Sequence, residues 1–288
     1  MKFISAILLL LLCTNCKKDR SGLFEKAENR GKVSGDLEEA SGLVASYQNP
    51  GKLWTLNDSG NPADIFLLND KGEIEMTCKL KKIENRDWED IAIGPGPNDG
   101  IKYLYVGEIG DNEAKYEYKY LYRLEEPTFD GNKKTSIDKI DTLVISLPDG
   151  KRDMESITID QVTGDLYLFS KREENINIYR SVASALIPGD TLVPEKIGTL
   201  PYHNVVAVDF TPDSKELLIK TYDEIYYWSK PDSLSIQQVL LQDPILLNYK
   251  REPQGESVAW SLDGSGFYNL SETTKDTIGK LYFYKRAK

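Results

Sequence analysis

The chain has 288 residues, of which 40% are hydrophobic and 28% are charged, so it can bury a sizeable core and is neither disordered nor collagen-like. Its 36 basic and 46 acidic side chains give a net charge of −10, which disfavours nucleic acid as a partner because the phosphate backbone would be repelled. The single histidine, His203, cannot build a multi-histidine zinc site and leaves one imidazole base for any catalytic triad.

The N-terminus has the features of a targeting segment. Lys2 precedes an apolar run from Phe3 to Cys13, which is too short to span a bilayer but has the length of the hydrophobic part of a signal peptide. The run ends in Leu12–Cys16 followed by two lysines, and this segment resembles the lipobox of bacterial lipoproteins, particularly those of Bacteroidetes-type bacteria. It departs from the usual pattern in having Cys13 where Leu is common and the bulky Asn15 where a small residue is common.

The lipobox resemblance implies a division of the chain and a location. Residues 1–15 would be a lipoprotein signal peptide, residues 16–35 the lipidated Cys16 with a tether and a closing strand, and residues 36–288 the folded domain. Palmitate on Cys16 would anchor the protein in the cell envelope as an outer-membrane lipoprotein, on either the periplasmic or the surface face. Processing would leave Cys78 without a disulfide partner, so we expect it to be a buried, unreactive side chain in a strand.

Short apolar runs that recur after residue 36 predict an all-β domain built from repeats. Five runs of one shape begin the repeats, and four of them open with glutamate: Glu39–Leu43, Glu89–Ile93, Glu155–Ile159, Val206–Phe210 and Glu256–Trp260. Their spacings are 50, 66, 51 and 50 residues, which is typical of propeller blades.

Each run is followed by further strands. The second strands are expected at Leu53–Leu56, Tyr103–Val106, Leu166–Phe169, Leu217–Ile219 and Phe267–Leu270. The third strands are expected at Ile65–Leu68, Tyr120–Tyr122, Ile176–Tyr179, Ile225–Trp228 and Leu281–Tyr284. Weaker fourth strands are expected at Thr142–Ile145 and Gln238–Leu241, as suits the outer edge of a blade.

The prediction is a five-bladed β-propeller closed by its N-terminus. The fifth repeat ends after three strands, so its outer strand is expected from Phe24–Val33. The long gap between the second and third repeats, with polar parts at Asp111–Lys119 and Asp130–Ile137, leaves a sixth blade as the alternative. Five blades are favoured because the 16 inserted residues are far fewer than one blade needs.

Several segments together resemble a known family: Ala40–Leu43, Leu53–Gly60, Asp87–Ala92, Gly94–Pro97, Tyr105–Asn112, Lys220–Tyr222 and Gly255–Ser257. They are similar to an uncharacterised family of secreted bacterial β-propeller lipoproteins with WD-repeat-like descriptions, which implies the fold and an extracytoplasmic setting but no activity. A more distant likeness, in blade number and acidic positions, is to the calcium-activated nucleotidases, whose five blades surround a calcium ion.

The starts of the inner strands and the ends of the second strands meet on one face of a propeller, so their polar residues are the candidate site. Glu39, Glu89, Glu155 and Glu256 would crowd the central channel and repel one another unless a cation or proton lay between them. Oxygen ligands alone favour a hard cation such as Ca²⁺. The alternative is that each glutamate accepts backbone N–H groups of a neighbouring blade.

Further residues of this face are expected to bind the ligand: Asp58, Asp90, Glu108, Asp111, Lys171, Arg172, Lys220, Tyr222 and Glu272. Basic side chains beside a bound cation suit a small anionic ligand, although they could instead pair with the carboxylates. His203 lies just before the fourth inner strand and is a candidate for a general base or for an anion contact.

Two functions follow from these patterns. The first is a membrane-anchored, extracytoplasmic propeller that binds a small anionic ligand or a protein partner on its channel face, around a central divalent cation. The alternative is a metal-dependent hydrolase of phosphate or other esters, with His203 or an acidic residue acting on water. Glycosidase chemistry needs two opposed carboxylates, and the sequence selects no such pair.

Overall fold

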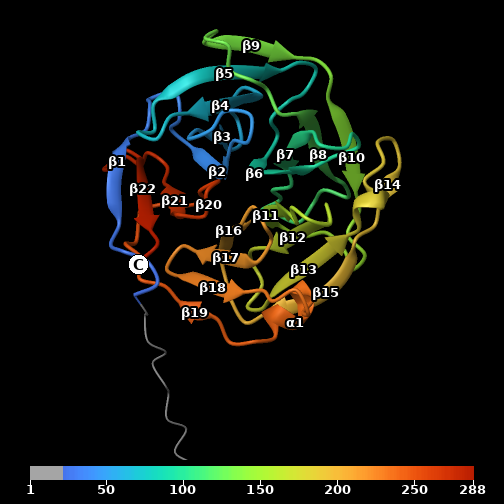
Figure 1. Cartoon of the computed structure of the whole chain (residues 1–288). Helices are drawn as coiled ribbons and strands as arrows, with labels where there is room; N and C mark the ends of the chain where they lie inside the picture. The colour runs from blue at the N-terminus through green and yellow to red at the C-terminus, as the bar shows by residue number, and fades with distance from the viewer. Residues whose placement is uncertain (1–21) are drawn as a thin grey trace, which may run out of the picture.

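The computed structural model describes residues 22–288, so the predicted signal peptide and the lipidation of Cys16 lie outside the described residues. Five sheets surround a common centre, and the innermost strand of each lies next to that centre (Figure 1). The prediction of an all-β, five-bladed propeller is therefore confirmed.

Each blade follows the chain outward from the centre. Blade 1 contains β2 (Ala40–Ala45), β3 (Leu53–Asn57), β4 (Asp64–Leu68), β5 (Ile74–Leu80) and β9 (Lys134–Ile137). Blade 2 contains β6 (Trp88–Pro95), β7 (Lys102–Glu108), β8 (Lys119–Glu125), β10 (Asp141–Ile145) and β14 (Thr191–Leu192). Blade 3 contains β11 (Met154–Ile159), β12 (Leu166–Ser170), β13 (Ile176–Ser181) and β15 (Glu195–Leu200).

The last two blades complete the ring. Blade 4 contains β16 (Val205–Phe210), β17 (Glu216–Thr221), β18 (Ile225–Ser229) and β19 (Ile245–Leu246). Blade 5 contains β20 (Ser257–Trp260), β21 (Gly266–Leu270), β22 (Lys280–Lys285) and β1 (Glu28–Lys32). A 3₁₀ turn at Ala183–Ala185 and the helix α1 at Ile236–Leu240 are short additions to this plan.

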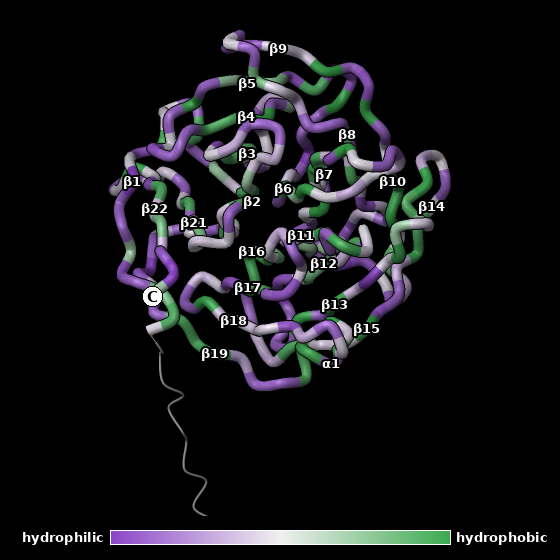
Figure 2. Tube along the Cα trace, in the orientation of Figure 1, coloured by the Kyte–Doolittle hydropathy of each residue, from purple (hydrophilic) through white to green (hydrophobic). Residues whose placement is uncertain are grey.

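Apolar side chains on both faces of the inner strands pack between neighbouring blades. Every residue of β2 and of β11 is buried, so their apolar residues are not confined to alternate positions. The core is divided into five apolar clusters, one between each pair of adjacent blades. The outermost strands β1 and β9 are largely hydrophilic (Figure 2).

The N-terminal segment closes the ring, as predicted. β1 pairs antiparallel with β22 as the fourth strand of blade 5. Phe24, just before β1, is 6% exposed and packs its ring 4.9 Å from that of Phe267 and 5.8 Å from that of Trp260. The closure therefore rests on a strand ladder and on an aromatic contact.

One predicted strand is wrong. Gln238–Leu241 was expected to form the outer strand of blade 4, but residues 236–240 form α1 and the outer strand is β19. The physical reason is a capping box: the Ser235 hydroxyl accepts the Gln238 N–H, and the Gln238 side chain accepts the Ser235 N–H.

The insertion after the second repeat does not form a sixth blade. Its second polar part contributes β9, which pairs in parallel with β5 and extends blade 1 to five strands. The later hairpin at β14 extends blade 2 in the same way by pairing with β10.

Candidate functional site

In two blades the inner strand begins with an irregularity that falls on a predicted site residue. In β6 the pairing register skips Glu89, and in β11 it skips Glu155. Such β-bulges turn a side chain out of the regular alternation, and they are common at the rims of closed sheets. In blade 4 the same irregularity falls at Val206, so that blade supplies no carboxylate at this level.

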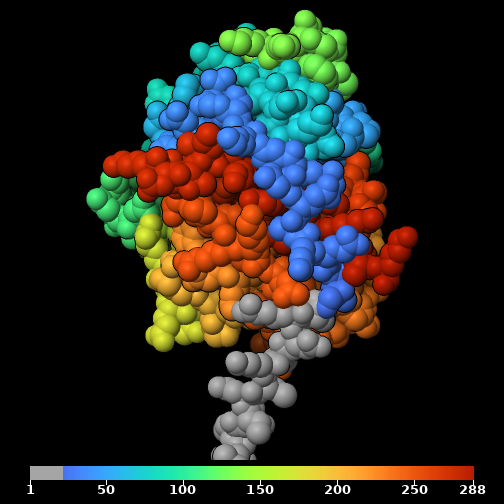
Figure 3. All heavy atoms as spheres, turned by 90° about the vertical axis from the view of Figure 1, so that its left-hand side faces the viewer, coloured from blue at the N-terminus to red at the C-terminus, as the bar shows by residue number. Residues whose placement is uncertain are grey.

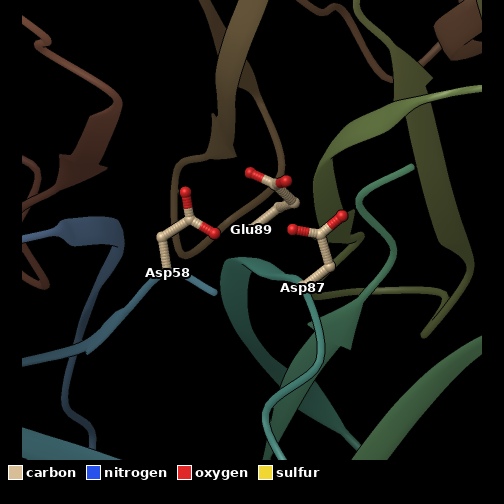
Figure 4. Close-up of side chains that lie close together, drawn as sticks. All are labelled: Asp58, Asp87 and Glu89. Carbon is tan, nitrogen blue, oxygen red and sulfur yellow. The ribbon is translucent and has the colours of Figure 1, made fainter. Parts of the chain in front are cut away.

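Seven carboxylates gather at the starts of inner strands and the ends of second strands. They form three groups whose oxygens lie within 4.8 Å of one another: Asp58, Asp87 and Glu89; Asp58, Glu256 and Glu272; and Glu89, Asp153 and Glu155. Because Asp58 and Glu89 each belong to two groups, the seven residues form one continuous set, called here the acidic cluster. Figure 4 shows the carboxylates of its first group facing one another.

Positive charge does not balance this cluster. Among the described residues, Lys171 contacts Glu155 and lies 4.0 Å from Glu256, and Arg172 pairs with Asp153 at 2.5 Å. Two basic side chains thus face seven carboxylates. The excess of negative charge must be relieved by protons or by a bound cation.

Burial and like charge raise the pKa values of the cluster. Loss of solvation, followed by the nearby Glu155, raises the pKa of Glu89 well above its usual value. Burial is also the main cause for Glu272, whose pKa rises to about 9, and for Asp58, whose pKa rises to about 6. Without a cation, part of the cluster is therefore protonated at neutral pH.

Glu89 is a buried member of the cluster without a contacting partner among the described residues. Its side chain is buried, with the residue 5% exposed, and no described residue donates a hydrogen bond to its carboxylate or forms an ion pair with it. Gly110 leaves room for it, because a Cβ there would overlap Glu89 Oε1 and lie 2.5 Å from Asp87 Cγ. A buried carboxylate without a donor is costly unless a cation or a proton accompanies it.

The donor set fits a hard cation. All ligand atoms of the three groups are carboxylate oxygens, which suit Ca²⁺ in its usual sphere of six to eight oxygens. If three or four carboxylates bind the ion, coordination positions remain for water or for oxygens of a ligand.

The structure places three of the four predicted metal ligands in the cluster and one outside. Glu89, Glu155 and Glu256 are members and are buried. Glu39 is exposed at the rim, where it accepts a hydrogen bond from Asn61, and it belongs to none of the three groups. The reason is register, since the irregularity of the first inner strand falls at Gly42 instead of Glu39.

Among the predicted ligand-binding residues, Asp58 and Glu272 lie in the cluster, while Lys171, Arg172 and Tyr222 contact it. Tyr222 does so by donating its hydroxyl hydrogen to Glu256.

The other acidic predictions lie at structural positions. Glu108 accepts the N–H groups of Arg86 and Asp87 and thereby holds the turn that presents Asp87. Asp111 is buried and accepts a hydrogen bond from Lys119 Nζ at 2.8 Å. Asp90 is enclosed between blades 2 and 3, where its carboxylate accepts the backbone N–H of Ile157.

The two remaining predictions make no described contact with the cluster. Lys220 is fully buried, with Nζ 3.2 Å from the carbonyl of Ser257 and 3.5 Å from Glu252. His203 is exposed, and its Nδ1 lies 3.1 Å from the carbonyl of Glu173. Neither arrangement gives these side chains a direct role at the carboxylates.

Sequence reasoning did not select Asp87 and Asp153, although a pattern marks both. Each stands two residues before a cluster glutamate, in Asp87–Glu89 and in Asp153–Glu155. Side chains two apart along an extended chain point to the same side, so this repeated spacing indicates a paired carboxylate at the start of a strand.

No family model matches the chain, and a search of curated proteins found no match. The structure defines the class of the protein as a five-bladed β-propeller with an acidic centre on one face. Within residues 22–288, no helix combines the length and the apolar character needed to cross a bilayer.

Proposed function

We propose that the chain is a lipid-anchored, extracytoplasmic propeller that binds one hard divalent cation, Ca²⁺, in its acidic cluster. The cation would in turn hold a small anionic ligand or an acidic group of a protein partner on the same face. The observation that carries the proposal is the buried carboxylate of Glu89, which lacks a donor and lies within 4.8 Å of four other carboxylates.

The charges around the cluster support an anionic ligand once the cation is present. A divalent ion offsets part of the negative charge and has coordination positions for the ligand's oxygens. Lys171 and Arg172 stand at the edge of the cluster, and the Arg172 side chain is 48% exposed, so its guanidinium can reach a ligand from solvent.

Calorimetric unfolding with EDTA and then with Ca²⁺ tests the cation site. A ligand that binds only the folded state stabilises it by about 2.7 kcal/mol at one hundred times its Kd, so the melting temperature should rise on adding Ca²⁺. Glu89→Gln should abolish most of this rise, whereas Glu84→Gln, which changes an exposed glutamate outside the cluster, should preserve it. Glu39→Gln in the same assay tests the fourth ligand predicted from sequence.

Elemental analysis of protein purified without chelator measures its metal content independently. An unchanged melting temperature together with the absence of bound metal would show that protons alone compensate the cluster, and the proposal would fail.

A metal-dependent esterase or phosphatase is a second candidate, favoured by the position of Glu272. This carboxyl is only partly buried at one end of the cluster, and without a cation its pKa is about 9. If the ion binds at the other end, beside Glu89 and Glu155, Glu272 would be the carboxyl that keeps a proton to donate to a leaving group. Hydrolysis of p-nitrophenyl phosphate and p-nitrophenyl acetate with Ca²⁺ tests this activity. Turnover that is lost in Glu272→Gln while Ca²⁺ still binds would favour the enzyme, and absence of turnover would leave a binding protein.

The lipid anchor is tested separately. Cells expressing the complete chain should incorporate radiolabelled palmitate into the protein, and Cys16→Ala should release it from the membrane fraction. Label that persists in Cys16→Ala would contradict the assignment of Cys16.

A further inference from the structure

A polar groove lies on blade 1, beside the acidic cluster but separate from it. It consists of a cavity of about 810 Å³, whose walls include Asn57, Asp64 and Thr77, and a neighbouring cavity of about 440 Å³. The two share Asp36, Thr77 and Lys134, so they form one elongated depression, called here the blade 1 groove. Its larger cavity is in the range of about 300–1,000 Å³ that is usual for small-molecule sites.

The insertion in the repeat pattern builds one wall of this groove. Lys134, Thr135 and Ser136 line it from β9, which pairs in parallel with β5 and lies outside the four strands of an ordinary blade. Figure 3 shows β9 at the upper edge of the molecule, with β5 beneath it and the N-terminal segment crossing below. The residues that interrupt the regular spacing thus help to form this groove.

Two buried acceptors in the groove have no hydrogen-bond donor. Asn57 is 5% exposed, its Nδ2 donates to the carbonyl of Asp36, and its Oδ1 has no partner among the described residues. Oδ1 of Asp64, which begins the neighbouring strand β4, also has no partner among them. Both oxygens are closed to water, so an occupant would reach them only when the side chains of Asn57 and Asp64 turn toward the groove. A buried acceptor without a donor is destabilising, so such a turn is favoured when the occupant brings O–H or N–H groups.

The charges of the groove cancel. In the larger cavity Asp36 and Asp64 face Lys79 and Lys134, and the smaller one adds two acidic and two basic residues, Glu73, Glu75, Lys32 and Lys133. The groove therefore selects neither an anion nor a cation.

The other wall groups also indicate hydroxyl chemistry. Thr77, Thr135 and Ser136 can both donate and accept hydrogen bonds. Phe66 is only 6% exposed, so the groove offers little of the aromatic surface that usually anchors a peptide or protein partner.

We propose that the blade 1 groove binds a neutral saccharide chain, whose hydroxyl groups donate to Asn57 and Asp64 and exchange hydrogen bonds with the threonine and serine hydroxyls. The elongated shape fits several sugar units in a row. This site goes beyond the cation-dependent function proposed above and does not require the cation.

Isothermal titration of the purified chain with maltohexaose, cellohexaose, mannohexaose and xylohexaose tests the proposal, with binding to at least one of them expected. The double variant Thr77→Val/Ser136→Ala removes two wall hydroxyls with little change in shape and should weaken that binding about tenfold. Thr142→Val, on β10 and away from the groove, should bind like the parent chain, and the melting temperature of each variant checks its fold.

Other outcomes would overturn the proposal. Absence of binding to all four sugars at millimolar concentration would remove the saccharide assignment, and so would binding of an acidic or basic peptide in their place. If the double variant binds the sugar as tightly as the parent chain does, the sugar site lies elsewhere in the molecule. None of these results bears on Ca²⁺ binding, so the two proposals fail independently.

Discussion

At the scale of single residues, Gly110 determines the space in which the carboxylates of Asp87 and Glu89 meet. Its backbone is not in the left-handed region, so glycine is needed there for the absence of a side chain and not for conformational freedom. The carboxylates occupy the volume that a Cβ would fill. The position of the acidic cluster thus depends on a residue that carries no functional group.

Gly110→Ala should remove most of the effect of Ca²⁺ on the stability of the fold. The added methyl group displaces Glu89 and Asp87, so the rise in melting temperature on adding Ca²⁺ should largely disappear, with a loss of about 1–3 kcal/mol in stability from overpacking. Gly198→Ala on β15 is the matched control, because a Cβ there meets nothing within 4 Å. A full Ca²⁺ response in Gly110→Ala would show that this carboxylate pair does not bind the ion.

The raised pKa values of the cluster predict how stability depends on pH. The folded chain without cation binds protons at Glu272 and Asp58 more tightly than the unfolded chain does, so stability from these groups is complete below about pH 4 and is lost as the pH rises to about 9. In EDTA the melting temperature should therefore fall between about pH 6 and about pH 9.

Ca²⁺ should flatten this fall, because the ion replaces the protons. Glu272→Gln should also reduce the fall in EDTA, since the amide does not titrate in this range. A melting temperature in EDTA that rises over the same interval would contradict the protonation of the cluster.

At the scale of elements, neighbouring inner strands are held together by buried side chains. Asp90 on β6 accepts hydrogen bonds at 2.8 Å from the Ser156 hydroxyl and at 2.9 Å from the Ile157 N–H, both on β11. Asp209 on β16 makes the corresponding contact with the Trp260 N–H of blade 5. These aspartates extend the hydrogen bonding of each sheet across the gap between blades.

Asp90→Ala should lower the free energy of unfolding by about 3 kcal/mol, because it leaves two buried donors without an acceptor. Denaturant unfolding measures the loss, and Asp70→Ala at an exposed turn is the control. A change below about 0.5 kcal/mol would mean that water replaces the carboxylate without cost.

The elements also show which features a single sequence can predict. Apolar runs at a nearly constant spacing were enough to predict the blades and the closure of the ring, because every inner strand must be buried on both sides. The helix at Ile236–Leu240 was missed because its apolar residues resemble a strand, although Ser235 and Gln238 carry the capping pattern.

The positions of individual side chains depend on β-bulges, which the pattern of apolar residues does not encode. The alignment of the repeats predicts Glu89 and Glu155 as site residues, and both lie in the cluster. In blade 1 the bulge falls at Gly42, so Glu39 lies outside the cluster. The sequence predicts Asp90 as a ligand-binding residue of this face. Only the packing of blade 3 against blade 2 reveals that its side chain faces the neighbouring strand.

At the scale of the whole molecule, the two ends of the described chain hold the ring closed. β1 pairs with β22, and a bridge between Phe24 and Arg286 brings the segments together (Figure 1). A tether that begins next to β1 would therefore attach any anchor at the seam of the propeller. The stability of the ring and the proposed attachment to a membrane would then depend on the same few residues.

Removing the N-terminal segment should open this seam. A chain that begins at Asp36 loses β1 and the ring of Phe24, leaving the long edge of β22 unpaired and Trp260 and Phe267 partly exposed. Loss of a buried phenylalanine alone costs about 3–5 kcal/mol, so the melting temperature should fall by roughly 10 °C, and the open edge should promote aggregation.

Calorimetry and light scattering compare this chain with one that begins at Ser21 and keeps β1. Phe24→Ala in the longer chain separates the two contributions: it should lower the melting temperature without promoting aggregation, because the edge of β22 stays covered. If the chain beginning at Asp36 melts at the same temperature as the longer one and remains monomeric, β1 is not needed for closure. The ring would then be held by its five interblade clusters alone, and the N-terminal segment would serve only as a tether.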